Sequence, residues 1–258
     1  MLNVCFAGVT GWTAAAIVPA IDASSDLALT VGVARSSAGR TLFGAPVVAT
    51  VKEAVAAAPV DVVVDFTKAG AVRGNVSAAI EAGKHVVIGT SGLTADDYAE
   101  IDAHARAQGV GVLAAGNFSV MAAVLRRAAA TAARHLGHWE IIDYASATKG
   151  DVPSGTAREL AETLGQVRQP GGAVPLDALH GPVEARGADI AGSRVHSVRL
   201  PSFVVSTEVV FGGTGERLVM RHDPGPSAEP YVAGALLAIR RVADHVGVRR
   251  GIDSLLFD

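Results

Sequence analysis

The chain has 258 residues, half of them hydrophobic, and its formal net charge at pH 7 is −3. This length suits one large domain or two smaller ones, and a weak charge without a basic stripe excludes nucleic acid as a partner. No apolar run reaches the roughly 18 residues of a membrane span, and the apolar N-terminus lacks the basic start of a signal peptide. We therefore expect a cytoplasmic protein with no membrane partner. The single cysteine, Cys5, excludes an intrachain disulfide.

The first half of the chain alternates short β-branched runs with alanine-rich helical stretches. The predicted strands are 2–7, 27–34, 60–66, 85–88 and 110–114. The predicted helices are 12–22, 50–57, 69–83 and 94–108, with a brief strand before the second of them. Continuous apolar strands separated by helices indicate a parallel sheet covered on both faces, which is a doubly wound, Rossmann-like α/β domain.

The pattern changes after Asn117, where strands follow one another without intervening helices. The predicted strands are 139–144, 194–199, 203–211 and 216–222, and the predicted helices are 119–136, 156–168 and 228–246. Successive strands favour a mixed or antiparallel sheet, so we expect a smaller α+β domain over 118–227. The last helix is expected to return to the first domain, which then comprises 1–117 and 228–258. The stretch 169–190 is the longest predicted loop and is a candidate cover for an active site.

A glycine-rich segment, 8–14, connects the first predicted strand to the first predicted helix. Gly8 permits a tight turn, Gly11 lets the backbone approach a pyrophosphate, and Ala14 is small enough for close helix–strand packing. The start of the helix then offers free N–H groups to phosphates, so the segment predicts a dinucleotide site, with a tight turn in an unrelated α/β protein as the alternative. The candidate cofactor-binding residues of this segment are Gly8, Thr10, Gly11, Trp12 and Thr13.

The end of the second predicted strand bears on the choice of cofactor. Enzymes that use NAD usually place an acid there to bind the ribose hydroxyls. This chain instead has Arg35, Ser36 and Ser37. An arginine can stack on adenine and pair with a 2′-phosphate, and the two hydroxyls can add hydrogen bonds. We therefore expect NADPH to be preferred over NADH, with a solvated arginine and use of both cofactors as the alternative.

Four further segments complete a pattern that runs over most of the chain. They are 64–67 (Val-Asp-Phe-Thr), 87–92 (Val-Ile-Gly-Thr-Ser-Gly), 115–119 (Ala-Gly-Asn-Phe-Ser) and 149–156 (Lys-Gly-Asp-Val-Pro-Ser-Gly-Thr). With the glycine-rich segment, and in the same order, they resemble the dihydrodipicolinate reductases (4-hydroxy-tetrahydrodipicolinate reductases). The last segment is long and specific, which makes chance agreement improbable.

The resemblance implies an NAD(P)H-dependent reductase of lysine biosynthesis that acts on a cyclic, unsaturated dicarboxylate. It implies a dinucleotide-binding N-terminal domain and a C-terminal domain that binds substrate and forms a homotetramer, or a homodimer, through its sheets. It also implies that 117–119 lie near the hinge between the domains. The residues that it places along the cofactor are Phe66, Thr67, Gly89, Thr90, Ser91, Asn117 and Phe118.

The segment 149–156 can be interpreted without the family. Thr156 and Glu159 have the spacing of a capping box, with Thr156 as N-cap, so a helix is expected to begin there. Ser154, Gly155 and Thr156 would bind an anion through backbone N–H groups, and Lys149 would add a positive charge. The segment therefore predicts a site for a small anionic substrate. The alternative is a capped helix beside a surface lysine.

The sequence departs from the family at the expected catalytic position. Family members have two adjacent histidines, the first of which assists protonation, where this chain has Ala145 and Ser146. Lys149 is retained and is the predicted catalytic proton donor, with Tyr144 and Ser146 as weaker candidates. An arginine common near the C-terminal helix is also missing, and Arg221 or His222 is the candidate replacement.

Two other interpretations follow from these departures. In the first, the chain is a non-catalytic NADP-binding paralogue that acts as a sensor or assembly protein. In the second, it is a reductase of a different imine outside lysine biosynthesis. No His or Cys cluster has the spacing of metal ligands, so no metal is expected.

Overall fold

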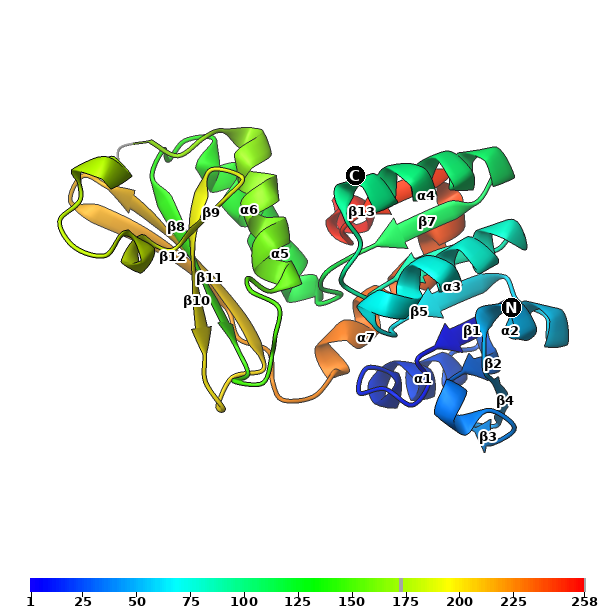
Figure 1. Cartoon of the computed structure of the whole chain (residues 1–258). Helices are drawn as coiled ribbons and strands as arrows, with labels where there is room; N and C mark the ends of the chain where they lie inside the picture. The colour runs from blue at the N-terminus through cyan, green and yellow to red at the C-terminus, as the bar shows by residue number, and fades with distance from the viewer. Residues whose placement is uncertain (172–173, 258) are drawn as a thin grey trace. The chain divides into compact units, whose positions relative to one another are not determined.

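The structure is a computed structural model that describes residues 1–171 and 174–257 (Figure 1). It divides into two compact units. Unit 1 comprises Met1–Val120 and Ser227–Asp258, and unit 2 comprises Met121–Pro226. Within the described ranges, no helix combines the length and the apolar character that crossing a bilayer requires.

Unit 1 is built on an eight-stranded sheet with the strand order β13-β7-β6-β5-β1-β2-β4-β3. Neighbouring strands are parallel except for β3, which is antiparallel to β4 at the edge. The strands are β1 Leu2–Ala7, β2 Leu27–Val33, β3 Thr41–Leu42, β4 Ala45–Val48, β5 Val62–Asp65, β6 His85–Ile88, β7 Gly111–Ala114 and β13 Gly247–Arg250. The order places β1 between β2 and β5, and the chain therefore winds outward from β1 in both directions, as in a Rossmann-like domain.

Helices cover both faces of this sheet, which is why its strands are apolar on both sides (Figure 1). One face packs against α2 Val51–Ala57, α3 Ala69–Glu81 and α4 Ala95–Gln108, and their apolar residues form one core cluster with alternate strand residues. The other face is covered by α1 Ala14–Asp22 and α7 Val232–Arg241. The predicted doubly wound domain is confirmed.

The predicted helix 228–246 is wrong in its extent. The segment consists of η4 Glu229–Tyr231, α7, and η5 Val242–Asp244, and the chain then forms the unpredicted strand β13 and the short helix α8 Asp253–Leu256. The break has a packing cause, because a Cβ at Gly111 in β7 would overlap the carbonyl oxygen of Val242, so the chain crosses in contact with that glycine. The run Gly247–Arg250 has one apolar side chain, Val248, and gave no strand pattern.

Unit 2 contains a mixed five-stranded sheet with the order β12-β11-β8-β10-β9. The strands are β8 Trp139–Ala145, β9 Ala188–Ile190, β10 Ser193–Arg199, β11 Val205–Gly213 and β12 Glu216–His222, and only β8 and β10 form a parallel pair. Helices α5 Val120–Ala133 and α6 Gly155–Val167 pack on one face of it (Figure 1). The predicted mixed sheet is confirmed.

The predicted loop 169–190 contains more structure than expected. It includes η2 Leu176–Ala178, η3 Val183–Arg186 and the strand β9, which pairs with β10. Residues 172–173 of this segment lie outside the described residues. The short strand was missed because its alternating pattern extends over only three residues.

Cys5 provides a test of the core. It is fully buried in β1, and burial, with a smaller contribution from the charge of Asp65, raises the pKa of its thiol to about 12. We expect thiol reagents to label the folded protein at least about 100-fold more slowly than the unfolded chain, because labelling requires local opening. Since the folded pKa exceeds the ordinary 9.0, this group should stabilise the fold below that pH and lose its contribution as the pH approaches 12. Fast labelling of the native protein would contradict the placement.

Candidate active site

The glycine-rich turn lies at the carboxyl end of β1, where the strand order reverses. Gly8 has a φ of +89°, and a Cβ on it would overlap the carbonyl oxygen of Phe66 at the end of β5. The N–H of Gly11 donates to the carbonyl of Gly8 over 2.8 Å, which closes the turn. Only glycine suits the first position, and the crevice between β1 and β5 is where ligands bind in sheets of this kind.

Helix α1 begins directly after this turn. Its N-cap, Thr13, makes no side-chain hydrogen bond to the first turn, so no side chain of the cap occupies the N–H groups there. Trp12 is half exposed and packs edge-on against Tyr231, with 6.1 Å between ring centroids. Thr10 is exposed at the tip of the turn. An uncapped helix start beside a glycine turn fits a bound pyrophosphate.

The residues predicted to select the cofactor form the 3₁₀ turn η1 Arg35–Ser37, immediately after β2. Arg35 and Ser36 are exposed, whereas Ser37 is buried. Within the described chain, the guanidinium of Arg35 makes no ion pair, so its charge is not neutralised by a neighbouring carboxylate. This arrangement has the charge and the exposure that a 2′-phosphate requires.

Asp65 is a buried residue that the sequence interpretation missed. Its Oδ1 accepts hydrogen bonds from the hydroxyls of Thr67 (2.8 Å) and Thr90 (2.5 Å), and its Oδ2 accepts one from the amide of Asn75 (2.8 Å). The Thr67 N–H donates to Thr90 Oγ1 over 2.7 Å. This carboxylate therefore ties together the ends of β5 and β6. The sequence signal was an acid that ends a continuous apolar run.

Phe66 and Gly89 are also brought together at this edge. The ring of Phe66 stacks on Phe6 at 5.8 Å and lies 5.3 Å from the ring of Phe118. A Cβ on Gly89 would overlap the Phe66 ring, so glycine is required there. Phe118 is buried in the core, and Asn117 accepts the N–H of Ser119 over 2.8 Å, whereas Ser91 is exposed beyond Thr90.

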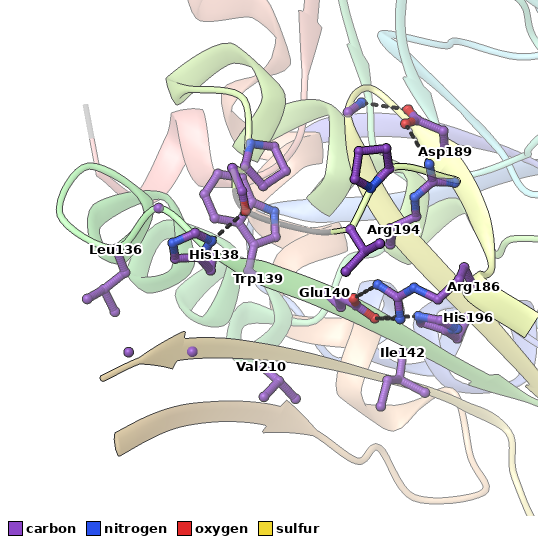
Figure 2. A pocket seen from close by; sticks show the side chains of 18 of the residues that line it. Leu136, His138, Trp139, Glu140, Ile142, Arg186, Asp189, Arg194, His196 and Val210 are labelled. Carbon is purple, nitrogen blue, oxygen red and sulfur yellow. Dashed lines mark hydrogen bonds and ion pairs between the residues drawn. The ribbon is translucent and has the colours of Figure 1, made fainter. Parts of the chain in front are cut away.

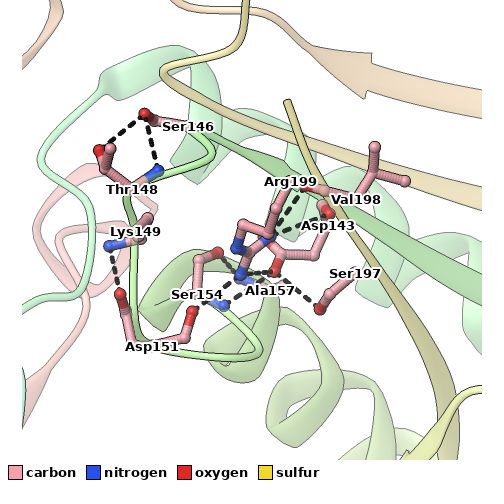
Figure 3. A network of polar contacts seen from close by, with 10 residues as sticks. All are labelled: Asp143, Ser146, Thr148, Lys149, Asp151, Ser154, Ala157, Ser197, Val198 and Arg199. Carbon is pink, nitrogen blue, oxygen red and sulfur yellow. Dashed lines mark hydrogen bonds and ion pairs between the residues drawn. The ribbon is translucent and has the colours of Figure 1, made fainter. Parts of the chain in front are cut away.

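The start of α6 corrects the predicted cap in unit 2 (Figure 3). The helix begins at Gly155, and Ser154 is the N-cap, with its hydroxyl accepting the Ala157 N–H over 3.3 Å. Thr156 lies inside the first turn. Glu159 does not reach back, because it forms an ion pair of 2.6 Å with Arg126 of α5. The N-cap is displaced by two residues, and the helix begins one residue before the predicted range 156–168.

We call residues 149–156 the anion loop, since they lead into this helix start. Lys149 Nζ pairs with Asp151 Oδ1 at 2.8 Å, and the Lys149 side chain is 29% exposed. The backbone N–H of Lys149 donates to the carbonyl of Ser146 over 3.0 Å, and the Ser146 hydroxyl lies 3.1 Å from the hydroxyl of Thr148 (Figure 3). The charged neighbour of Lys149 is thus a carboxylate that a bound anion would compete with.

Two of the weaker candidates lie on the opposite face of the sheet. Successive residues of β8 alternate between faces, so Tyr144 points away from Asp143, which contacts the anion loop. Arg221 lies over the Tyr144 ring at 4.7 Å and pairs with Asp223 at 2.7 Å. Tyr144 and Arg221 therefore do not face the anion loop. Ala145, at the position of the first family histidine, is buried, and its methyl side chain has no exchangeable proton.

A separate pocket of about 1,420 Å³ lies over the face of the unit 2 sheet that carries Tyr144 (Figure 2). Glu140 lies on its floor, paired with Arg186 and, at 2.7 Å, with His196. Burial alone would raise the pKa of the Glu140 carboxyl, but hydrogen bonds from Arg186 and His196 outweigh it and hold the pKa below its ordinary value. The charges of Glu140 and Arg186 neutralise one another. None of the predicted site residues lines the pocket, so it is not the predicted anion site.

The doubly wound sheet and the glycine turn at its switch point define unit 1 as a dinucleotide-binding domain of the Rossmann type. Two family models match the chain, the dihydrodipicolinate reductase N-terminus over residues 2–118 and the C-terminus over 118–256. The chain belongs to the dihydrodipicolinate reductase family, whose members are NAD(P)H-dependent oxidoreductases.

Individual relatives agree with this assignment. The chain is 36% identical to 4-hydroxy-tetrahydrodipicolinate reductase of Streptococcus suis, with 99% of both chains covered. It is 37% identical to the same enzyme of Carboxydothermus hydrogenoformans, over 85% of this chain and 82% of the relative. A dipicolinate-bound dihydrodipicolinate reductase from Paenisporosarcina sp. has the same fold, with a TM-score of 0.81, 24% identity and 99% of both chains covered.

Proposed function

We propose that this protein is an NADPH-dependent reductase of a small cyclic imine or unsaturated carboxylate, with 4-hydroxy-tetrahydrodipicolinate as the first candidate substrate. The observation that carries the proposal is the anion loop: a lysine and an N-terminal helix turn capped by Ser154 are retained although both histidines are replaced. A protein that only bound dinucleotide would have no use for a second anion site. The names of the full-length relatives supply the substrate.

In this proposal each unit has one task. The turn at Gly8, the start of α1 and the residues at the ends of β5 and β6 bind the dinucleotide, which supplies the hydride. Gly155 and Thr156 bind a substrate carboxylate through their N–H groups. The Lys149 ammonium neutralises that carboxylate and exchanges its bond to Asp151 for one to the substrate. Its proton then replaces the one that histidine supplies in family members.

The proton donor follows by elimination among the candidates. Ala145 has no proton to give, and Tyr144 is on the other face of the sheet. Ser146 donates poorly as a neutral hydroxyl. Lys149 is the one of the predicted donors that carries an acidic proton and belongs to the anion loop.

The binding part of the proposal is tested by calorimetry with dipicolinate, the ligand named in the Paenisporosarcina structure. We expect dipicolinate to bind in the presence of NADPH, and Lys149→Ala to weaken that binding. A protein that binds NADPH but not dipicolinate would contradict the proposed substrate class. It would support the second candidate, a non-catalytic NADP-binding protein, which the replacement of both histidines favours.

The preference for NADPH should depend on Arg35. Replacing it by alanine removes a charge-assisted bond to the 2′-phosphate, so we expect the Kd for NADPH to rise about 10- to 100-fold while the Kd for NADH stays constant. Fluorescence titration with both nucleotides measures this, and Arg134→Ala, an exposed arginine of α5's C-terminal end, is the control. An unchanged ratio of the two Kd values would contradict the role of Arg35.

The sheet face of unit 2 opposite α5 and α6 is the proposed oligomer interface, with a homotetramer or a homodimer as the product. Val210 and Val219 are paired across β11 and β12 on this face, and Val219 is 49% exposed. We expect Val219→Glu to dissociate the assembly, because a charge would be buried between two sheets. Leu218→Glu, on the other face of the same strand, is the control. Sedimentation velocity measures the mass of the wild-type protein and of the two variants, and equal masses for all three would contradict the proposed interface.

A further inference from the structure

Arg199 and Asp143 form a charged pair below the anion loop that the proposed chemistry does not use. Arg199 ends β10 and Asp143 lies in β8, the neighbouring parallel strand. Their side chains meet at 2.8 Å, between Arg199 Nη2 and Asp143 Oδ2, and are 16% and 0% exposed. A charged pair this deeply buried costs desolvation energy, and an apolar pair of similar volume would often be at least as stable. Its presence therefore calls for a role other than stability.

The carboxylate of Asp143 holds the end of the anion loop (Figure 3). Its Oδ2 accepts the backbone N–H of Ser154 over 2.9 Å and the hydroxyl of Ser197 over 3.1 Å, besides the guanidinium. Burial alone would raise the pKa of the Asp143 carboxyl, but the hydrogen bonds from Ser154 and Arg199 outweigh it and hold the pKa below its ordinary value. The residue that caps α6 is thus fixed to β8 by a charged acceptor.

The guanidinium of Arg199 holds the middle of the same loop. Its Nη2 also donates to the backbone carbonyl of Asp151 over 2.8 Å, and its Nη1 donates to the carbonyl of Val198 over 3.0 Å. One planar group therefore joins two strands to the residue that pairs with Lys149. Asp151 and Ser154 are the two points at which the Arg199–Asp143 pair fastens the loop, and the N–H groups of Gly155 and Thr156 follow directly after the second.

We propose that Arg199, acting through Asp143, is a positioning residue that sets the anion loop in the conformation that binds the substrate carboxylate. The identity of the ligand rests on the proposed function. The attachment of the loop to Arg199 and Asp143 does not. Neither side chain reaches the substrate in this account. Their effect is on where Lys149 and the N–H groups of Gly155 and Thr156 lie, and a displacement of about 1 Å can cost roughly 100-fold in a well-oriented site.

Two variants, Arg199→Met and Arg199→Lys, distinguish the hydrogen bonds that Arg199 makes to the loop from its positive charge. The methionine is similar in length and apolar, and the lysine keeps a charge but cannot bond Asp143, Asp151 and Val198 together with one planar group. We expect both to raise the Kd for dipicolinate and the KM for substrate about 10- to 100-fold. The Kd for NADPH should not change, because its site belongs to unit 1. In Arg199→Ala, tens of millimolar guanidinium should restore part of the dipicolinate affinity.

Arg186→Met is the matched control. Arg186 also bonds a carboxylate of β8, that of Glu140, but holds no part of the anion loop. It should change the unfolding midpoint without changing either ligand affinity. Hydrogen exchange of the amides of 150–157 provides a readout that needs no ligand, and it should accelerate in Arg199→Met and not in Arg186→Met.

The outcomes are distinct. If the amides of 150–157 exchange faster in Arg199→Met but the wild-type protein does not bind dipicolinate, the proposed function is overturned, whereas the attachment of the loop by Arg199 is supported. Unchanged exchange, or dipicolinate affinity within about twofold of wild type in Arg199→Met, would overturn the positioning role. If Arg199→Met fails to fold, Arg199→Lys and the guanidinium rescue of Arg199→Ala test the positioning role instead. Wild-type dipicolinate affinity in Arg199→Lys, together with no effect of guanidinium on Arg199→Ala, would overturn that role.

Discussion

Replacing Lys149 by alanine should lower kcat/KM for the reduction about 10²- to 10⁴-fold, the loss expected when a general acid is removed and nothing replaces it. The effect has two sources. The substrate carboxylate loses the ammonium that neutralises it, which raises KM. The developing negative charge on the reduced substrate loses its proton donor, which lowers kcat. The decrease in NADPH absorbance under initial-rate conditions measures both quantities.

Lys149→Arg distinguishes the two sources. A guanidinium keeps the positive charge but does not release its proton at neutral pH. We therefore expect KM to remain within about tenfold of wild type while kcat falls nearly as far as in Lys149→Ala. Lys52→Ala, an exposed lysine of α2, is the control. Full activity in Lys149→Ala would contradict both proposed roles of Lys149, as the group that binds the substrate carboxylate and as the proton donor.

Replacing Asp65 by alanine should destabilise unit 1 by about 3 kcal/mol or more and abolish tight binding of NADPH. The change leaves three side-chain donors, on Thr67, Thr90 and Asn75, without the acceptor that they share. A fully buried donor that loses its partner costs roughly 1–3 kcal/mol, so the buried Thr90 contributes most and the half-buried Thr67 and Asn75 contribute less. The turns after β5 and β6 are then no longer held together. Urea unfolding and a fluorescence titration with NADPH measure the two effects.

Asp61 supplies the matched control for Asp65. It precedes the opposite end of β5, where its Oδ2 accepts the N–H of Asn3 over 2.7 Å and the side-chain amide of Asn3 over 2.9 Å. Asp61→Ala should also lower the free energy of unfolding, but the Kd for NADPH at low temperature should be unchanged. An equal loss of NADPH affinity in the two variants would mean that Asp65 acts through global stability alone.

Much of the fold could be predicted because its signals are local. Continuous apolar runs such as the three valines of β5, Val62 to Val64, indicate parallel strands buried on both faces, and the glycine-rich turn places the first βα unit. The aromatic and β-branched residues of 139–144 (Trp-Glu-Ile-Ile-Asp-Tyr) likewise indicate a strand. These features depend on neighbours in the sequence, so no knowledge of distant contacts was needed.

The features that were missed depend on distant partners. Thr156 and Glu159 satisfy the capping pattern, but Arg126 on another helix takes the glutamate, and Ser154 becomes the cap. Nothing near Arg199 in the sequence indicates its bond to Asp143, 56 residues away. Sequence patterns locate the loops of a site, whereas the contacts that hold those loops require the folded chain.

Turnover with freshly generated 4-hydroxy-tetrahydrodipicolinate tests the central claim most directly. Purified protein and NADPH would be mixed with the substrate beside a family enzyme that has both histidines, and NADPH oxidation would be followed by absorbance. We predict stoichiometric oxidation of NADPH by the wild-type protein and oxidation about 10²- to 10⁴-fold slower in Lys149→Ala. An absence of oxidation, in a protein shown to bind both NADPH and dipicolinate, would contradict this assignment and leave the two alternatives, a reductase of a different imine or a non-catalytic member of the family.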